Sequence, residues 1–140
     1  GAIRVYDFNF IDYVLWKNRE ELKKDYDIKF EDFKFAYRRS IEHWYPQNPN
    51  GHDGESQLPA EFLHSFGNLC IITDSQNSRF GNSYPEAKLE QWEREGIFHR
   101  QSLKLQMMAK ITSKKNRWDI GEIQSMEKEV ERYVQNFCNS

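Results

Sequence analysis

Hydrolysis of a phosphodiester needs a base and a cation beside the phosphate, and four side chains of this sequence could supply them. Glu42 and His43 stand together, Asn68 starts a short apolar run, and Asn77 follows that run. Histidine is the side chain whose proton affinity suits a general base near neutral pH. Carboxylate and amide oxygens are ligands of hard cations such as Mg²⁺. These residue types therefore indicate a histidine base beside one divalent ion.

The spacing restricts how the four residues can meet. Neighbours on an extended strand point to opposite sides, so Glu42 and His43 share a site only if the strand bends or ends there. Pro46 predicts such an end. Asn77 lies far enough past Asn68 for a short strand, a tight turn and the first turn of a helix. The pattern is compatible with a hairpin and a crossing helix that face one pocket.

Periodicity predicts the elements that position this set. Phe33, Phe35 and Tyr37 alternate with polar or small residues and predict a half-buried strand that leads into His43. A loop rich in Pro, Asn and Gly spans residues 46–59. The other predicted elements are helices at 8–24, 60–66, 86–95 and 102–111, a strand at 69–73, a short helix after Asp74, and a last helix opened by Asp119 or Gly121.

Composition is that of one α+β domain. The chain has 140 residues, of which 38% are hydrophobic and 15% aromatic, enough for a core. No run is long enough to span a membrane and no leader opens the chain, so we expect a cytoplasmic protein and a C-terminal fragment of a longer one. Cys70 and Cys138 are predicted to be buried free thiols, and the absence of a Cys-x-x-Cys pair argues against structural zinc.

Charge does not decide the function. The net charge is -2, with a mildly basic middle between acidic ends. A local phosphate-binding face and a solvated surface of mixed charge explain this distribution about equally well.

Three segments together resemble the signature of HNH (ββα-metal, His-Me finger) nucleases. They are Ser40-Ile41-Glu42-His43-Trp44-Tyr45-Pro46-Gln47, Phe66-Gly67-Asn68-Leu69, and Ser75-Gln76-Asn77-Ser78-Arg79-Phe80-Gly81-Asn82. The set is most similar to the C-terminal domain of GmrSD-type modification-dependent restriction endonucleases. The same order of elements occurs in the HNH domain of RNA-guided CRISPR nucleases. Each dipeptide alone is weak, whereas the ordered set is fairly specific.

The resemblance implies a role for each residue of the set. His43 would be the catalytic base that deprotonates water, and Asn68 would support the catalytic site by holding the loop between the strands. Glu42 and Asn77 would bind one Mg²⁺ or Mn²⁺, which stabilises charge at the phosphate and leaves 5′-phosphate and 3′-hydroxyl ends. Arg79 and Lys88 are candidate substrate contacts to phosphate, although a solvated face explains each about as well.

The implied fold is a single mainly helical α+β domain over residues 1–140. A ββα-metal core at 33–95 would be enclosed by helical flanks at 8–24 and 100–138. The implied function is metal-dependent DNA cleavage in restriction and antiviral defence, with a nucleotide-dependent sensor domain on the N-terminal side in the parent protein. The alternative is a non-catalytic module that binds nucleic acid or a protein partner. RNA as substrate and the oligomeric state stay open.

The remaining polar and aromatic residues have ordinary explanations. We interpret His52 and Asp53 as solvated loop residues, and His64 and His99 as surface or partly buried histidines. The four tryptophans are interpreted as core: Trp16, Trp44, Trp92 and Trp118.

Overall fold

A computed structural model of the chain describes residues 4–47, 58–73 and 83–140. Two antiparallel strands, β1 (Ser40–His43) and β2 (Leu69–Ile72), form the only sheet of these ranges. Helices surround it, as the α+β prediction requires: α1 (Val5–Lys17), α2 (Arg19–Tyr26), α3 (Ala60–Leu63), α5 (Pro85–Glu95), α6 (Leu103–Lys115) and α7 (Ile120–Cys138). Two short 3₁₀ helices complete the order, η1 (Phe66–Asn68) and η2 (Phe98–Arg100).

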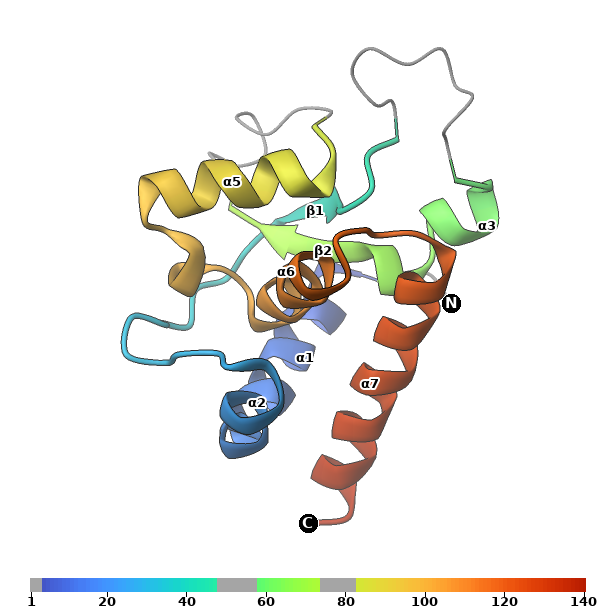
Figure 1. Cartoon of the computed structure of the whole chain (residues 1–140). Helices are drawn as coiled ribbons and strands as arrows, with labels where there is room; N and C mark the ends of the chain where they lie inside the picture. Colours follow the sequence, from blue (N-terminus) through green and yellow to red (C-terminus); the bar gives the residue numbers. More distant parts are fainter. Residues whose placement is uncertain (1–3, 48–57, 74–82) are drawn as a thin grey trace.

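The sheet lies between helices (Figure 1). Ser40 pairs with Ile72 and His43 pairs with Leu69, so the register places His43 at the end of the hairpin where η1 enters β2. One face of the sheet packs Leu69 and Ile71 against Phe8 of α1. The other face places Cys70 and Ile72 in the main core, which also contains Trp44, Trp92 and Trp118. Burial of these apolar side chains, at about 25 cal/mol per Å², is the main stabilising contribution.

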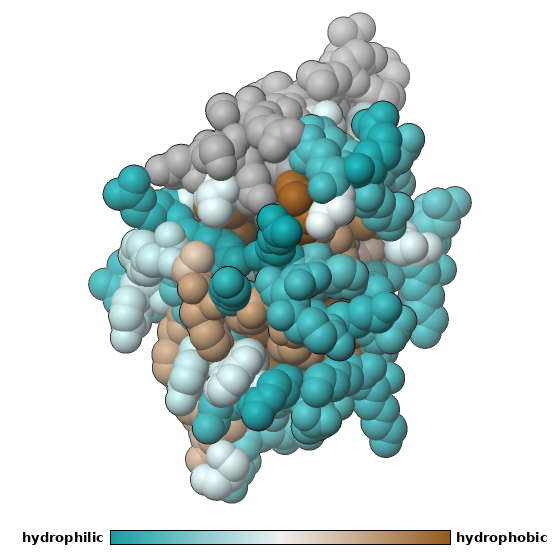
Figure 2. Space-filling view, turned by 90° about the vertical axis from the view of Figure 1, so that its left-hand side faces the viewer, coloured by the Kyte–Doolittle hydropathy of each residue, from teal (hydrophilic) through white to brown (hydrophobic). Residues whose placement is uncertain are grey.

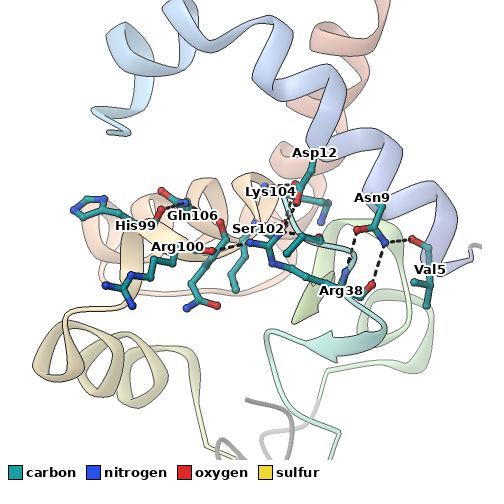
Figure 3. Close-up of polar contacts among 12 residues, drawn as sticks. Val5, Asn9, Asp12, Arg38, His99, Arg100, Ser102, Lys104 and Gln106 are labelled. Atoms are coloured by element: carbon teal, nitrogen blue, oxygen red, sulfur yellow. Dashed lines mark hydrogen bonds and ion pairs between the residues drawn. The ribbon is translucent and has the colours of Figure 1, made fainter. Parts of the chain in front are cut away.

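A buried polar network fixes where β1 begins. The side chain of Asn9 on α1 accepts a hydrogen bond from Arg38 N (3.2 Å) and donates one to Arg38 O (3.0 Å), as Figure 3 shows. The guanidinium of Arg38 donates to Arg100 O at 2.7 Å and lies 3.8 Å from Asp12 Oδ2. These contacts attach the chain to α1 and η2 immediately before Ser40.

The strand predicted from Phe33 onward is therefore wrong in its extent. Residues 34–39 carry no regular secondary structure, and Phe35 and Tyr37 are 52% and 64% exposed. Arg38 is the buried residue of this stretch, at 4%, because Asn9 and Asp12 of α1 supply its partners. The face of the molecule drawn in Figure 2 is mostly hydrophilic, with smaller hydrophobic areas between the hydrophilic side chains.

Two further predictions need correction. Asn18 divides the helix predicted over 8–24, because its side-chain amide donates to Val14 O (2.9 Å) and its backbone leaves the helical conformation (φ -102°, ψ 24°). Cys138 is an exposed free thiol at the end of α7, whereas Cys70 is free and buried as expected. Trp44, Trp92 and Trp118 are buried as predicted, and Trp16 is partly buried with Arg19 over its ring.

Local signals set the helix boundaries that were predicted closely. Pro85 occupies the first turn of α5, which ends at Gly96 with φ 67°. Asp119 caps α7 through a capping box with Glu122. No helix of the described residues has the length and apolar character needed to cross a membrane.

Candidate active site

The site is built at the end of the hairpin, where β1 stops at His43. The next residue still pairs with the segment that enters β2, because Trp44 N donates to Asn68 O at 2.9 Å. Tyr45 N then donates to the side-chain oxygen of Asn68 at 2.8 Å. These contacts fix the direction of the chain after β1, and His43 is the last residue of that strand.

His43 contacts two polar side chains through its ring. Its Nε2 lies 3.0 Å from Nδ1 of His64, which follows α3, and its Nδ1 lies 3.1 Å from Nε2 of Gln47. The two imidazole rings are nearly perpendicular, at 85°, with centroids 5.1 Å apart. Both His64 and Gln47 are exposed, and His43 is partly buried.

Burial keeps the base candidate neutral. Desolvation by burial, followed by electrostatic interactions with His64 and Lys88, lowers the pKa of His43 to about 4. At pH 7 the imidazole therefore has a free lone pair, the state that a general base requires.

The Glu42 side chain lies within the protein, at 8% exposure. Its carboxylate is buried, and Oε2 lies 3.6 Å from Nζ of Lys88 with no hydrogen bond to any described residue. Burial raises the pKa of Glu42, against the opposing effect of the Lys88 charge. A buried carboxylate oxygen without a hydrogen-bond partner is costly unless another group contacts it.

Lys88 of α5 is enclosed by protein. Its side chain is fully buried, and Nζ donates to His43 O (2.7 Å) and Trp44 O (3.0 Å). Burial lowers the pKa of Lys88, although the Glu42 carboxylate opposes that effect. In this position the ammonium holds the backbone of the base candidate and is not exposed to a phosphate.

A second buried lysine holds the other strand. Nζ of Lys104 on α6 donates to Phe66 O (2.9 Å) and Leu69 O (2.5 Å), which flank Asn68 in the sequence. Burial lowers its pKa to about 8. The backbone NH of the same residue donates to Asp12 Oδ1 at 3.2 Å, which joins this lysine to the network of Figure 3.

The Asn68 amide is saturated by protein groups. Its oxygen accepts from Tyr45 N (2.8 Å) and Trp118 Nε1 (2.9 Å). Its nitrogen donates to Tyr45 O (3.1 Å) and Leu63 O (2.9 Å). With all four interactions formed inside the protein, Asn68 has no capacity left for substrate, so this geometry suits a supporting residue.

Not every predicted site residue can be placed. Asn77 and Arg79 lie outside the described residues, as do His52 and Asp53. Within the described ranges no group of three or more His, Cys, Asp or Glu side chains could hold a metal ion. The metal role of Glu42 with Asn77 and the phosphate role of Arg79 stay predictions. The buried position of Lys88 does not favour the predicted phosphate contact.

The sequence interpretation missed two neighbours of His43. His64 was interpreted as an ordinary histidine, and Gln47 had no assigned role. The spacing does contain a signal for His64, which stands four residues before Asn68, at the entry to the second strand. A histidine there lies at the same end of the hairpin as one that closes the first strand.

Comparison with known proteins identifies the family. The family model described as "GmrSD restriction endonucleases, C-terminal domain" matches residues 2–130, which is most of the chain. The chain belongs to this family, one of restriction endonucleases. Searches of curated proteins and of solved structures gave no match.

Proposed function

We propose that this chain is a metal-dependent endonuclease domain of the HNH type that hydrolyses DNA phosphodiester bonds. The observation that carries the proposal is the position of His43. The His43 imidazole is partly exposed and has a lowered pKa, and it stands at the end of β1. The buried Lys88 donates a hydrogen bond to the backbone carbonyl of the same residue. Membership of a restriction endonuclease family supports phosphodiester hydrolysis as its chemistry.

The residues present fit a hard divalent cation. Oε2 of Glu42 is buried, lies 3.6 Å from Nζ of Lys88 and has no hydrogen bond to any residue that the structure describes; carboxylate oxygen is a ligand that Mg²⁺ and Mn²⁺ accept. In the proposal Glu42 and Asn77 hold the ion. A bound ion of this kind stabilises negative charge on the phosphate and on the leaving oxygen.

The chain's own residues account for the remaining requirements. His43 accepts a proton from the attacking water, and its lowered pKa leaves the imidazole unprotonated at neutral pH. Lys88 and Lys104 fix the backbone at the ends of both strands, which fixes the origin of the imidazole side chain. Positioning of this kind contributes to the rate because the reacting atoms need no further ordering.

The parent protein is proposed to act in defence against modified foreign DNA in the cytoplasm, with a nucleotide-dependent sensor domain on the N-terminal side that selects the target. Family membership supports this wider proposal. The proposal about the parent protein is independent of the role assigned to His43.

A nicking assay tests the proposal. Supercoiled plasmid is incubated with Mg²⁺ or Mn²⁺ and with wild type, His43→Ala or His99→Ala. His99 is a matched control, because it lies on η2 and contacts Phe98 rather than His43. Wild type and His99→Ala should nick the plasmid, and EDTA or His43→Ala should abolish nicking.

Two outcomes would contradict the proposal. Equal nicking by wild type and His43→Ala would remove the base role. DNA binding by all three proteins without nicking, with either metal and at high protein concentration, would favour a non-catalytic binding module. A parallel assay with single-stranded RNA decides between the two nucleic acids, since faster cleavage of RNA would overturn the choice of DNA.

A further inference from the structure

The contacts of the His43 ring determine which nitrogen carries the proton. Nε2 of Gln47 is an amide nitrogen, which donates hydrogen bonds and accepts none. It lies 3.1 Å from Nδ1 of His43, so Nδ1 is the acceptor. Neutral imidazole carries its single proton on the other nitrogen. Nε2 of His43 is therefore the donor in the 3.0 Å contact with Nδ1 of His64.

We propose that His64 is the positioning residue for the catalytic base. Nδ1 of His64 accepts the Nε2 proton of His43 and selects the tautomer whose Nδ1 has the free lone pair. Nδ1 is then the atom that takes the proton from water, and the water replaces the exposed amide of Gln47. This assignment rests on the proposed nuclease function, because it describes how the base of that reaction is held.

The backbone around both histidines supports the assignment. Asn68 Nδ2 donates to Tyr45 O (3.1 Å) and to Leu63 O (2.9 Å), so one amide joins the segment after His43 to the residue before His64. His64 N also donates to Ala60 O of α3 at 3.1 Å. A fully buried side chain thus joins the backbone segments that carry the two rings, and the His64 side chain itself is exposed.

The distance between the two rings excludes a different role for His64. A general acid that protonates the leaving oxygen has to stand across the phosphorus from the base, because attack and departure occur in line. The two imidazoles are instead in direct hydrogen-bond contact, at 3.0 Å. No phosphate fits between them, so His64 acts on the base and not on the leaving group.

Two substitutions of His64 separate positioning from a merely structural role. His64→Ala removes the acceptor. His64→Asn keeps a side-chain oxygen close to where Nδ1 stood. His99→Ala again serves as the control. Two quantities are measured at neutral pH: the ¹⁵N chemical shifts of the His43 ring, which report the protonated nitrogen, and kcat and KM for nicking.

The expected results follow from the loss of one orienting hydrogen bond. Wild type and His64→Asn should show His43 protonated on Nε2, whereas His64→Ala should show a mixture of tautomers. The kcat of His64→Ala should fall about 10- to 100-fold, the usual effect of removing an orienting partner, with KM unchanged. His64→Asn should recover most of the loss.

The refuting results are equally specific. His43 protonated on Nδ1 in the wild type, or an unchanged tautomer in His64→Ala, would overturn the proposal. A rise in KM alone in His64→Ala would also overturn it, because it would indicate contact with substrate. A shift of tautomer in His64→Ala without nicking by any protein would support the positioning and overturn the nuclease function, so the two failures are distinguishable.

Discussion

Replacement of Lys88 by methionine tests whether this residue holds the site or touches DNA. Methionine matches the length and apolar character of the lysine stem but has no ammonium. The substitution leaves His43 O and Trp44 O without their donor and Glu42 without its ion-pair partner, all three beside a fully buried side chain. Removing one member of a buried ion pair costs about 3–5 kcal/mol.

Two effects reduce that cost. Methionine avoids the desolvation that lowers the pKa of Lys88, and Glu42, whose pKa is raised by burial, can take up a proton once the lysine is gone. We therefore expect Lys88→Met to lower the free energy of unfolding by about 3 kcal/mol, out of roughly 5–15 kcal/mol for a domain. For a chain of this size the melting temperature should fall by about 10 °C.

Urea unfolding of four proteins provides the measurement: wild type, Lys88→Met, Glu42→Gln and the double variant. Glutamine has no charge to leave unpaired, so the double variant should be more stable than the two single effects predict, by about 1–2 kcal/mol. Lys128→Met on α7 is the control, because that lysine is exposed. Its free energy of unfolding should stay within about 0.5 kcal/mol of the wild type.

The salt dependence of DNA binding tests the alternative, in which Lys88 contacts phosphate. A lysine that contacts phosphate contributes about one unit to the slope of log K against log salt concentration. We expect Lys88→Met to leave this slope unchanged. An unchanged stability, together with weaker DNA binding and a slope reduced by about one, would refute the buried role of Lys88 and restore the phosphate contact predicted from the sequence.

Two shorter predictions concern packing and pH. A Cβ on Gly67 would lie 2.2 Å from Ile123 O of α7, a backbone atom, so Gly67→Ala should destabilise the protein by about 3 kcal/mol in urea unfolding. Gly121→Ala, which meets nothing within 4 Å, should change stability by less than about 1 kcal/mol, and equal effects of the two would contradict the packing argument. Because the pKa of His43 is lowered to about 4, kcat/KM for nicking should stay high down to about pH 5 and fall as the pH drops through that pKa. An acidic limb centred near the ordinary histidine value of about 6.5 would show that the imidazole is not desolvated.

The parts of the fold that could be predicted are those with local causes. Proline in a first turn gave the start of α5, and Asp119, predicted with Gly121 as the alternative, gave the start of α7. A short apolar run gave β2 within one residue. Each of these signals acts over one helical turn or one strand, so the sequence alone contains it.

The errors have non-local causes. Alternation predicted that Phe35 and Tyr37 would be buried, but the buried residue is Arg38, whose partners lie on α1 and η2. Lys88 was predicted to contact phosphate or to lie on a solvated face, but it is buried, and its acceptors are the carbonyls of His43 and Trp44, more than forty positions earlier in the chain. Every residue has a carbonyl, so no residue type in the sequence marks these acceptors.

The same reasoning explains why the sequence suggested Glu42, His43 and Asn68 as site residues but did not suggest His64. Glu42, His43 and Asn68 carry distinctive side chains within a short ordered pattern. His64 has an equally distinctive side chain, but its relation to His43 depends on the Asn68 amide that joins Tyr45 to Leu63. A chemical type can be read from one position, whereas a contact between two loops requires the fold.

The two buried lysines resolve a conflict inherent in this small sheet. Each strand has only four residues, so the carbonyls just beyond the His43 end have no strand partner among the described residues. Buried carbonyls without donors are costly, yet closing that end with a third strand would cover His43. Lys88 and Lys104 reach from α5 and α6 and satisfy two carbonyls each: His43 O and Trp44 O, Phe66 O and Leu69 O. The two lysines thus hold the backbone from within the core and leave the His43 imidazole accessible. This arrangement requires the desolvation of two ammonium groups, which is unfavourable.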